Sequence, residues 1–278
     1  PIYVRKRSAG QSLEALLLQV LPYAKHPEKM IDHLHRGWIK IDGKHPSLQQ
    51  VLVAGNTIEL VIPDTVEPPI GIELKVLYED QSLVVVHKPS PLPVHPCGRY
   101  NRNSLTAIAK EAWPDIELKP VHRLDANTTG VLVFARTTAS ARWLMAEFSE
   151  KRVKKQYLAR VMGVPEQRMF SVDVAIDSAP SKAGTRKVSA QGQTAQTDVI
   201  LQKDFGDGTS LLLVQPRTGR TNQIRLHLQT VGLPIVGDGA YGEQVHLDDG
   251  MTQDQVHLGL HAHRLSFRHP DSQDEMTF

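Results

Sequence analysis

Hydrophobic positions near the N-terminus follow first a helical and then a strand pattern. Leucine and valine side chains recur at helical spacing over residues 13–20, and a second helical stretch covers about 28–36. Apolar and polar residues then alternate over 38–44, up to an Asp-Gly turn, and alternate again over 57–62. The pattern predicts two short helices followed by a hairpin, and we assign residues 12–62 to one small α+β domain.

The pattern changes after this region. Residues 63–71 contain three prolines and have the composition of a semi-rigid linker, so we place a domain boundary there. From residue 72 to 278, short β-type runs alternate irregularly with helical patterns. The strand-like runs are 82–87, 130–135, 156–162, 198–201 and 210–214. Strands and helices in irregular order predict an α+β fold with a mixed, mainly antiparallel sheet, and not a doubly wound sheet.

The composition narrows the class of protein. Hydrophobic residues make up 40% and charged residues 22% of the chain, and no apolar run approaches the roughly 20 residues of a membrane span. The first residues lack the apolar segment of a secretory signal. A single cysteine, Cys97, excludes an intrachain disulfide and fits a reducing compartment. We therefore expect a cytoplasmic protein, and we expect it to be a monomer.

Charge is distributed unevenly along the chain, although the net charge is only +2. Residues 119–160 carry nine lysines or arginines against three acidic residues, whereas residues 238–278 carry eight acidic residues against two arginines. A basic middle suits a protein that binds a polyanion on one face. A solvated helix surface would explain the same distribution, so charge alone leaves both interpretations open.

Two further patterns suggest cofactors but lack the context that a cofactor site needs. Residues 237–242 read G-x-G-x-x-G, but the following 243–250 do not open an apolar helix, as dinucleotide binding requires. His257, His261 and His263 could be metal ligands, yet no carboxylate or cysteine completes the set, and the last two alternate as strand residues do. Phosphate-loop, zinc-hydrolase and serine-hydrolase motifs do not occur. We expect neither a cofactor nor a metal.

Three polar segments remain, and each carries one candidate functional side chain. They are 119–130 with Asp125, 154–160 with Tyr157, and 218–228 with Arg225. Asp125 stands among basic and hydroxyl residues in a loop that leads into a strand, and Tyr157 lies on a strand entered by lysines. The apolar side of the helix expected to carry Arg225 is formed by Ile224, Leu228 and Val231. Arg225 lies beside that stripe, from which its side chain can reach a buried carboxylate.

Together the three segments resemble the RluA-type RNA pseudouridine synthases. The family motifs read roughly HRLDxxTSG, a Lys-x-Tyr strand, and TGRTHQIRxH followed by G-D-x-x-Y-G, and the resemblance covers about residues 75–270. Thr129 stands where serine is usual and Asn222 where histidine is usual, and both retain hydrogen-bonding capacity. Residues 12–62 resemble an S4 RNA-binding domain, in which such a hairpin turn ends in Asn/Asp-Gly-Lys.

The resemblance implies an enzyme that isomerises uridine to pseudouridine in structured RNA without a cofactor. Asp125 would be the indispensable carboxylate, either attacking C1′ of the ribose or removing a proton from C2′. Both routes need the carboxylate ionised, and Arg225 would be its salt-bridge partner. Tyr157 would pack on the uracil and help to remove the proton from C5.

The resemblance also implies the residues that bind the RNA. Arg123 would prop open the space left when the target uridine leaves its stack. Leu226 would form an apolar wall against the base, and Arg220 would contact the RNA. Phosphate contacts are expected from Lys151, Lys154 and Lys155.

Alternatives remain at this point. A non-catalytic RNA-binding protein would have no need for a buried carboxylate, and a nucleoside hydrolase or glycosidase would normally need paired carboxylates. The RNA itself is open as well, because an S4-like domain is typical of family members that act on ribosomal RNA. In contrast, residues 95–100 resemble the branch that modifies transfer RNA.

Overall fold

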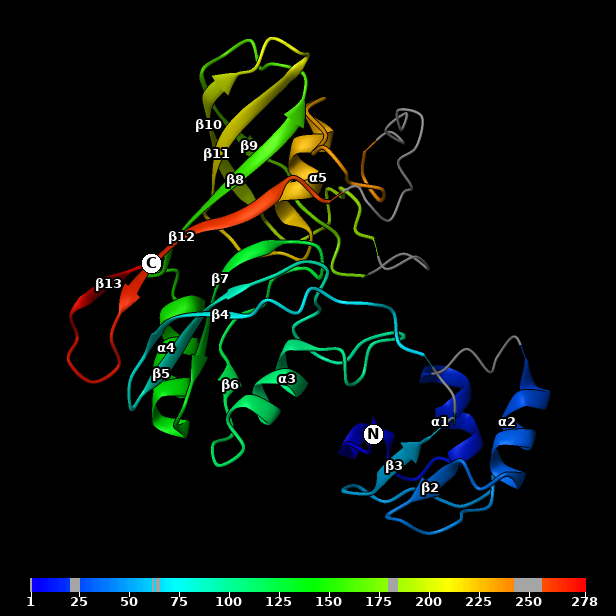
Figure 1. Cartoon of the computed structure of the whole chain (residues 1–278). Helices are drawn as coiled ribbons and strands as arrows, with labels where there is room; N and C mark the ends of the chain where they lie inside the picture. Colours follow the sequence, from blue (N-terminus) through cyan, green and yellow to red (C-terminus); the bar gives the residue numbers. More distant parts are fainter. Residues whose placement is uncertain (1, 21–25, 62, 64–65, 180–184, 243–256) are drawn as a thin grey trace. The chain divides into compact units, whose positions relative to one another are not determined.

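The computed structural model describes residues 2–20, 26–61, 63, 66–179, 185–242 and 257–278. The chain forms two compact units, Pro1–Val66 and Glu67–Phe278. The elements of the N-terminal unit are β1 (Ile2–Tyr3), a 3-10 turn η1 (Lys6–Ser8), α1 (Leu13–Val20), α2 (Pro27–His35), β2 (Ile39–Ile41) and β3 (Thr57–Leu60). Figure 1 shows α1, α2, β2 and β3 in blue. The three strands are antiparallel and lie in the order β1-β3-β2.

The N-terminal unit has its own hydrophobic core. Leu13 and Leu17 of α1 and Ile58 of β3 are fully buried in it. The predicted Asp-Gly turn is fixed by Asp42, whose carboxylate accepts hydrogen bonds from the backbone of Thr57 at 2.8 Å and from Asn56 Nδ2 at 2.7 Å. The assignment of the N-terminal unit to the S4-like domains stays a prediction.

The predicted linker at 63–71 is too long. The carboxylate of Glu67 accepts hydrogen bonds from three consecutive backbone N–H groups, those of residues 101–103, at 2.7–2.9 Å. The backbone N–H of Gly71 donates to the carbonyl of Pro91 at 2.8 Å. Residues 67–71 therefore belong to the second unit, because these contacts attach an extended, proline-rich segment to its surface.

The second unit is built on one ten-stranded mixed sheet. Its elements are β4 (Lys75–Glu79), β5 (Leu83–Lys88), α3 (Leu105–Ala112), β6 (Lys119–Pro120), β7 (Thr129–Ala135), α4 (Thr138–Ser149), β8 (Lys154–Met162), β9 (Met169–Asp173), β10 (Gln196–Asp204), β11 (Thr209–Pro216), α5 (Gln223–Thr230), β12 (Leu260–Arg268) and β13 (Glu275–Thr277). The main strand order is β4-β5-β7-β12-β8-β11-β10-β9, and the pairing of β7 with β12 is parallel. The α+β class expected from the sequence is confirmed.

Two halves of this sheet meet at β12, which Figure 1 shows running between β8 and β7. Helix α4 packs on β7, and the hydroxyl of Thr137 caps it by accepting the backbone N–H of Ser140 at 3.0 Å. Helix α5 packs on β11 in the other half. Within the described residues, none of the helices is long and apolar enough to cross a membrane.

Helix α5 corrects one prediction. Ile224 and Leu228 are buried against the sheet as expected, but Val231 is 42% exposed. The helix ends at Thr230, and Gly232 takes a positive φ of 75° that turns the chain away. The helical period therefore no longer places Val231 on the apolar side.

Candidate active site

Asp125 lies in the loop between β6 and β7, whose backbone is fixed by its neighbours. Leu124 is buried in the hydrophobic cluster shared by α3, β5 and β7. The carbonyl of Ala126 accepts the backbone N–H of Leu92 at 2.8 Å, and Thr128 N–H donates to the carbonyl of Asp125 at 3.1 Å. These contacts hold the loop while the carboxylate of Asp125, 25% exposed, faces a cleft.

Where this loop enters β7, its backbone lies very close to the backbone of β12. Gly130 has a φ of +116°, and a Cβ placed on it would lie 2.2 Å from the carbonyl oxygen of Ala262. Only glycine fits here, because any side chain would separate the two strands. The hydroxyl of Thr129 lies 2.8 Å from Nδ1 of His261, so this hydroxyl joins β7 to β12.

Arg225 of α5 bridges two carboxylates. Its Nη1 lies 3.2 Å from Oδ2 of Asp125, and its Nε and Nη2 make two hydrogen bonds of 2.7 Å to the carboxylate of Asp238. The carboxylate of Asp238 also accepts the backbone N–H groups of Ala240 at 3.0 Å and Tyr241 at 3.1 Å. Desolvation opposes the charge of Arg225, but the hydrogen bonds and negative charge of Asp238, together with Asp125, raise its pKa.

Asp238 and Tyr241 were not predicted as partners of Arg225. The guanidinium carbon of Arg225 lies 5.0 Å from the centre of the Tyr241 ring, a cation–π distance. The hydroxyl of Tyr241 accepts hydrogen bonds from Asn222 Nδ2 at 3.0 Å and from the backbone N–H of Arg186 at 2.5 Å. The signal in the sequence was the G-D-x-x-Y-G stretch, whose aspartate and tyrosine together orient the guanidinium.

Tyr157 of β8 borders the same cleft. Burial raises the pKa of its hydroxyl, and the negative charge of Asp125 raises it further. The phenol therefore keeps its proton at neutral pH, and it can donate a hydrogen bond or pass on a proton.

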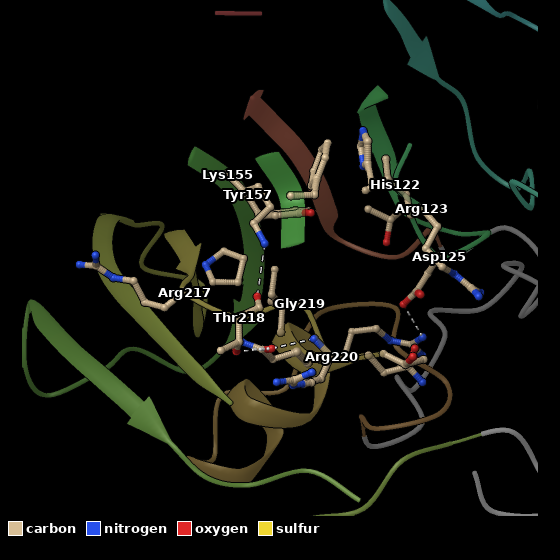
Figure 2. A pocket seen from close by; sticks show the side chains of 18 of the residues that line it. His122, Arg123, Asp125, Lys155, Tyr157, Arg217, Thr218, Gly219 and Arg220 are labelled. Carbon is tan, nitrogen blue, oxygen red and sulfur yellow. Dashed lines mark hydrogen bonds and ion pairs between the residues drawn. The ribbon is translucent and has the colours of Figure 1, made fainter. Parts of the chain in front are cut away.

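The cleft has a volume of about 540 Å³. Figure 2 shows its labelled side chains, among them Asp125, Tyr157 and Lys155. In the described part of the chain its cationic lining residues are Arg123, Lys151, Lys155, Arg217, Arg220 and Arg225, and the carboxylate among them is Asp125. One carboxylate in a strongly cationic cleft suits a polyanionic ligand that must place one uncharged group beside that carboxylate.

His122 precedes these residues in the loop and is structural. Burial lowers the pKa of its imidazole to about 3, and the charge of Lys155 contributes to the lowering. Its Nε2 lies 3.1 Å from the backbone N–H of Val133 and accepts that hydrogen. The ring stacks on Phe148 with a centroid separation of 4.7 Å. This hydrogen bond occupies Nε2, so we assign His122 a structural role and not that of a general base.

Two predicted RNA-binding residues lie away from the cleft. Lys154 points out of it and pairs with Glu275 at 2.9 Å, because adjacent residues of a strand face opposite ways. Leu226 is 4% exposed and packs with Ile176 and Ala195, so it does not form the apolar wall. The apolar lining near Tyr157 comes instead from Ile224 and Leu260.

Lys88 was missed by the sequence analysis. It ends β5, is fully buried, and its ammonium donates to the carbonyls of Pro89 at 2.9 Å, Leu92 at 2.8 Å and Ala126 at 3.0 Å. Burial lowers the pKa of Lys88 to about 7, and the charge of Asp125 partly opposes that shift. The ammonium thus ties the end of β5 to the residue after Asp125.

We expect Lys88→Met to change how stability depends on pH. The ordinary lysine pKa of 10.5 holds in the unfolded chain and a pKa of about 7 in the folded one, so the unfolded state binds more protons between these values. From pH 7 to about pH 9.5, the free energy of unfolding should therefore increase by about 3 kcal/mol more in the wild type than in the variant. Urea unfolding of both proteins at the two pH values measures this difference, and a constant difference would contradict it.

The described residues contain no group of three histidine, cysteine or acidic side chains arranged to hold a metal. His261 and His263 lie on β12, as the alternation in the sequence suggested. In the G-x-G-x-x-G stretch, the carboxylate of Asp238 accepts two hydrogen bonds from the guanidinium of Arg225. The segment 243–250, which the sequence analysis used against a dinucleotide site, falls outside the described residues.

Comparison with known proteins shows the family of this chain. The family model described as RNA pseudouridylate synthase matches residues 82–230, more than half of the chain. The ribosomal large subunit pseudouridine synthase D of Xanthomonas campestris pv. campestris is 32% identical over 279 residues, covering 95% of this chain and 83% of that protein. The chain belongs to the RNA pseudouridylate synthase family. The family expected from the three motifs is thereby confirmed.

Two further comparisons cover less of the relative or show a lower identity. The pseudouridylate synthase RPUSD2 of Homo sapiens is 37% identical over 176 residues, which cover 63% of this chain but 32% of that protein. The chain therefore spans about a third of this curated relative. The solved structure of human RNA pseudouridylate synthase domain containing 1 has a TM-score of 0.61 at 27% identity, covering 77% of this chain and 85% of that one.

Proposed function

We propose that this chain is an RNA pseudouridine synthase that uses Asp125 and no cofactor. One observation carries the proposal: Asp125 is the carboxylate of a cation-lined cleft, paired with Arg225 at 3.2 Å and bordered by Tyr157. Arg225 thus places a positive charge beside the carboxylate that begins the reaction. A glycosidase-type hydrolysis would require a second carboxylate in the cleft.

The chemistry balances without any added group. The bond from uracil N1 to ribose C1′ breaks, the base rotates, and a bond from C5 to C1′ forms. C5 loses one proton and N1 gains one, so the product is an isomer of the substrate. Asp125 opens the reaction either by attacking C1′ or by taking a proton from C2′. Tyr157, which keeps its own proton at neutral pH, packs against the base and relays the C5 proton through its hydroxyl or a water.

The remaining lining residues bind RNA in this proposal. Arg123 is exposed beside Asp125 and props the space left by the flipped uridine. Ile224 and Leu260 take the part of the apolar wall that the sequence assigned to Leu226. Arg220, whose Nε donates to the carbonyl of Thr194 at 3.1 Å, contacts phosphate with its remaining N–H groups.

For the substrate we propose ribosomal RNA, with the N-terminal unit acting as an S4-like RNA-binding domain. The match to a relative named for the ribosomal large subunit covers 95% of the chain, which must include most of residues 1–66. Transfer RNA, suggested by residues 95–100, is the alternative substrate. We propose a monomer, because one chain supplies Asp125, Tyr157 and Arg225. We propose a cytoplasmic location, because a single cysteine fits a reducing compartment.

The proposal is tested with RNA that carries tritium at C5 of uridine. We expect the protein to release tritium, to leave the mass of the unlabelled RNA unchanged, and to liberate no free uracil. Release of uracil would identify a hydrolase, and binding without any tritium release would identify an RNA-binding protein. Substrates prepared from ribosomal and transfer RNA separately would distinguish the two classes of RNA.

Lys155 and Lys154 offer a matched pair of variants for RNA binding. Lys155 lines the cleft, and its ammonium lies 3.4 Å from the carbonyl of Thr218, whereas Lys154 pairs with Glu275 outside it. We expect Lys155→Ala to weaken RNA binding several-fold and to reduce the slope of log affinity against log salt by about 1. Lys154→Ala should change neither quantity. Fluorescence anisotropy over a salt series measures both, and equal effects of the two variants would contradict the assignment.

A further inference from the structure

The cleft continues beyond Asp125 to a second wall, formed by the end of α4 and the turn after it. Met145, Phe148, Ser149 and Lys151 line this wall. Phe148 and Ser149 follow Met145 by three and four positions on the helix, so the three side chains share one face. Met145 is 49% exposed. An exposed, polarizable thioether beside an aromatic ring is therefore directed into a cationic cleft.

The aromatic part of this wall is rigid and uncharged. Phe148 packs against the hydrophobic cluster of β5, β7 and α4, and its ring stacks on His122 with an interplanar angle of 22°. His122 is fixed in turn by the backbone N–H of Val133. Since burial lowers the pKa of His122 to about 3, the pair carries no charge at neutral pH. Such a surface suits stacking of a nucleobase at little cost in side-chain entropy.

The cations after α4 differ in their pairing. Lys151 and Lys155 line the cleft, and neither forms an ion pair in the part of the chain that the structure describes. The residues between them face elsewhere: Arg152 pairs with two carboxylates of α4 and its C-terminus, and Lys154 pairs with Glu275. Among these four described cations, the two without an acidic partner are therefore the two that line the cleft.

Lys151 also has a backbone conformation that lysine disfavours. Its φ is 60°, in the left-handed region, and it directly follows the C-cap of α4. Glycine takes this conformation after a helix without steric cost. The lysine side chain at this position thus works against backbone stability, as side chains at binding sites often do.

We propose that Met145, Phe148 and Lys151 form a second RNA subsite, which binds an unpaired nucleotide next to the target uridine. The base lies against Met145 and the His122–Phe148 pair, and a phosphate lies at Lys151. The inference rests on the proposed function, since it assumes that RNA enters this cleft. Stacking accepts any base, so the subsite selects for an unpaired neighbour and not for its identity.

The test measures binding of two fluorescein-labelled probes to the full chain. One is a short single-stranded oligouridylate, and the other is a strand of the same length with abasic ribose at every position. We expect Met145→Ser to weaken binding of the intact strand about fivefold, on the scale of one stacked base, and to leave the abasic strand almost unaffected. Met162→Ser is the control, because Met162 is 44% exposed on β8 and lies outside the cleft.

Lys151→Gly separates binding from folding. We expect it to weaken binding of both probes and to lower the salt slope by about 1. Its thermal unfolding midpoint should be unchanged or higher, because the left-handed backbone is relieved. Equal effects of Met145→Ser on both probes, or unchanged affinity in Lys151→Gly, would overturn the subsite. These measurements do not use catalysis, so they fail independently of the tritium-release assay that tests the proposed function.

Discussion

Replacing Asp125 with asparagine should abolish tritium release while leaving the fold intact. The amide has the same size, but it carries no charge and is a poor nucleophile and base. Loss of a nucleophile of this kind lowers the rate by about 10⁴-fold or more. The cleft holds no second carboxylate among the described residues that could replace it. We therefore expect the variant to release tritium at the rate of the reaction without enzyme.

The structure also indicates that the variant would lose activity because the reacting carboxylate is missing, and not because the fold or the RNA affinity changes. In Asp125→Asn, Arg225 keeps both of its 2.7 Å hydrogen bonds to Asp238, so the guanidinium remains paired and oriented. The thermal midpoint and the affinity for RNA should stay close to the wild-type values. Asp207→Asn is a matched control, since Asp207 is exposed, pairs with Arg160 and lies outside the cleft. Tritium release by Asp125→Asn at the wild-type rate would disprove the role of Asp125.

Local patterns in the sequence indicated the main elements, whereas the pairing of Arg225 with Asp125 was implied by the family resemblance. Ile224 and Leu228 marked the buried side of α5, and this placed Arg225 at its edge, where the structure has it 3.2 Å from Asp125. Gly130, the second residue of β7, was visible as part of a motif. Its physical reason, a backbone approach of β12 that leaves no room for a Cβ, appears only in three dimensions.

Long-range packing explains what the sequence analysis missed. Leu226 was assigned to the apolar wall, but its neighbours Ile176 and Ala195 come from an irregular segment that no periodicity places against α5. The sequence analysis treated Asp238 as one residue of a glycine-rich stretch. Its buried, bidentate contact with Arg225 depends on long-range packing that the stretch does not reveal.

Lys154 is a different case. The alternation of a strand already indicated that Lys155 and Tyr157 share one face and that Lys154 faces the other way. The structure has the two cleft-lining residues on that shared face, and Lys154 in an ion pair with Glu275 outside it. The position of Lys154 outside the cleft could therefore have been predicted from the sequence, unlike the packing of Leu226 and Asp238.

Arg225→Ala should reduce both stability and activity. Asp238 is 1% exposed at its side chain, and among the described residues the substitution leaves its buried carboxylate with two backbone N–H partners. Breaking a buried ion pair from one side costs about 3–5 kcal/mol of unfolding free energy. The ionised carboxylate of Asp125 also loses its nearest counter-charge, and we expect tritium release to fall by at least about 10²-fold.

Two further variants separate charge from geometry in this prediction. Arg160→Ala removes an exposed arginine that pairs with Asp207, and it should cost no more than about 1 kcal/mol. Arg225→Lys keeps the charge but cannot make the bidentate contact to Asp238 and reach Asp125 at once, because an ammonium lacks the planar fork. It should recover part of the stability and little of the activity. Urea unfolding and tritium release measured on all three variants would decide this, and equal losses of stability in Arg225→Ala and Arg160→Ala would contradict the buried pair.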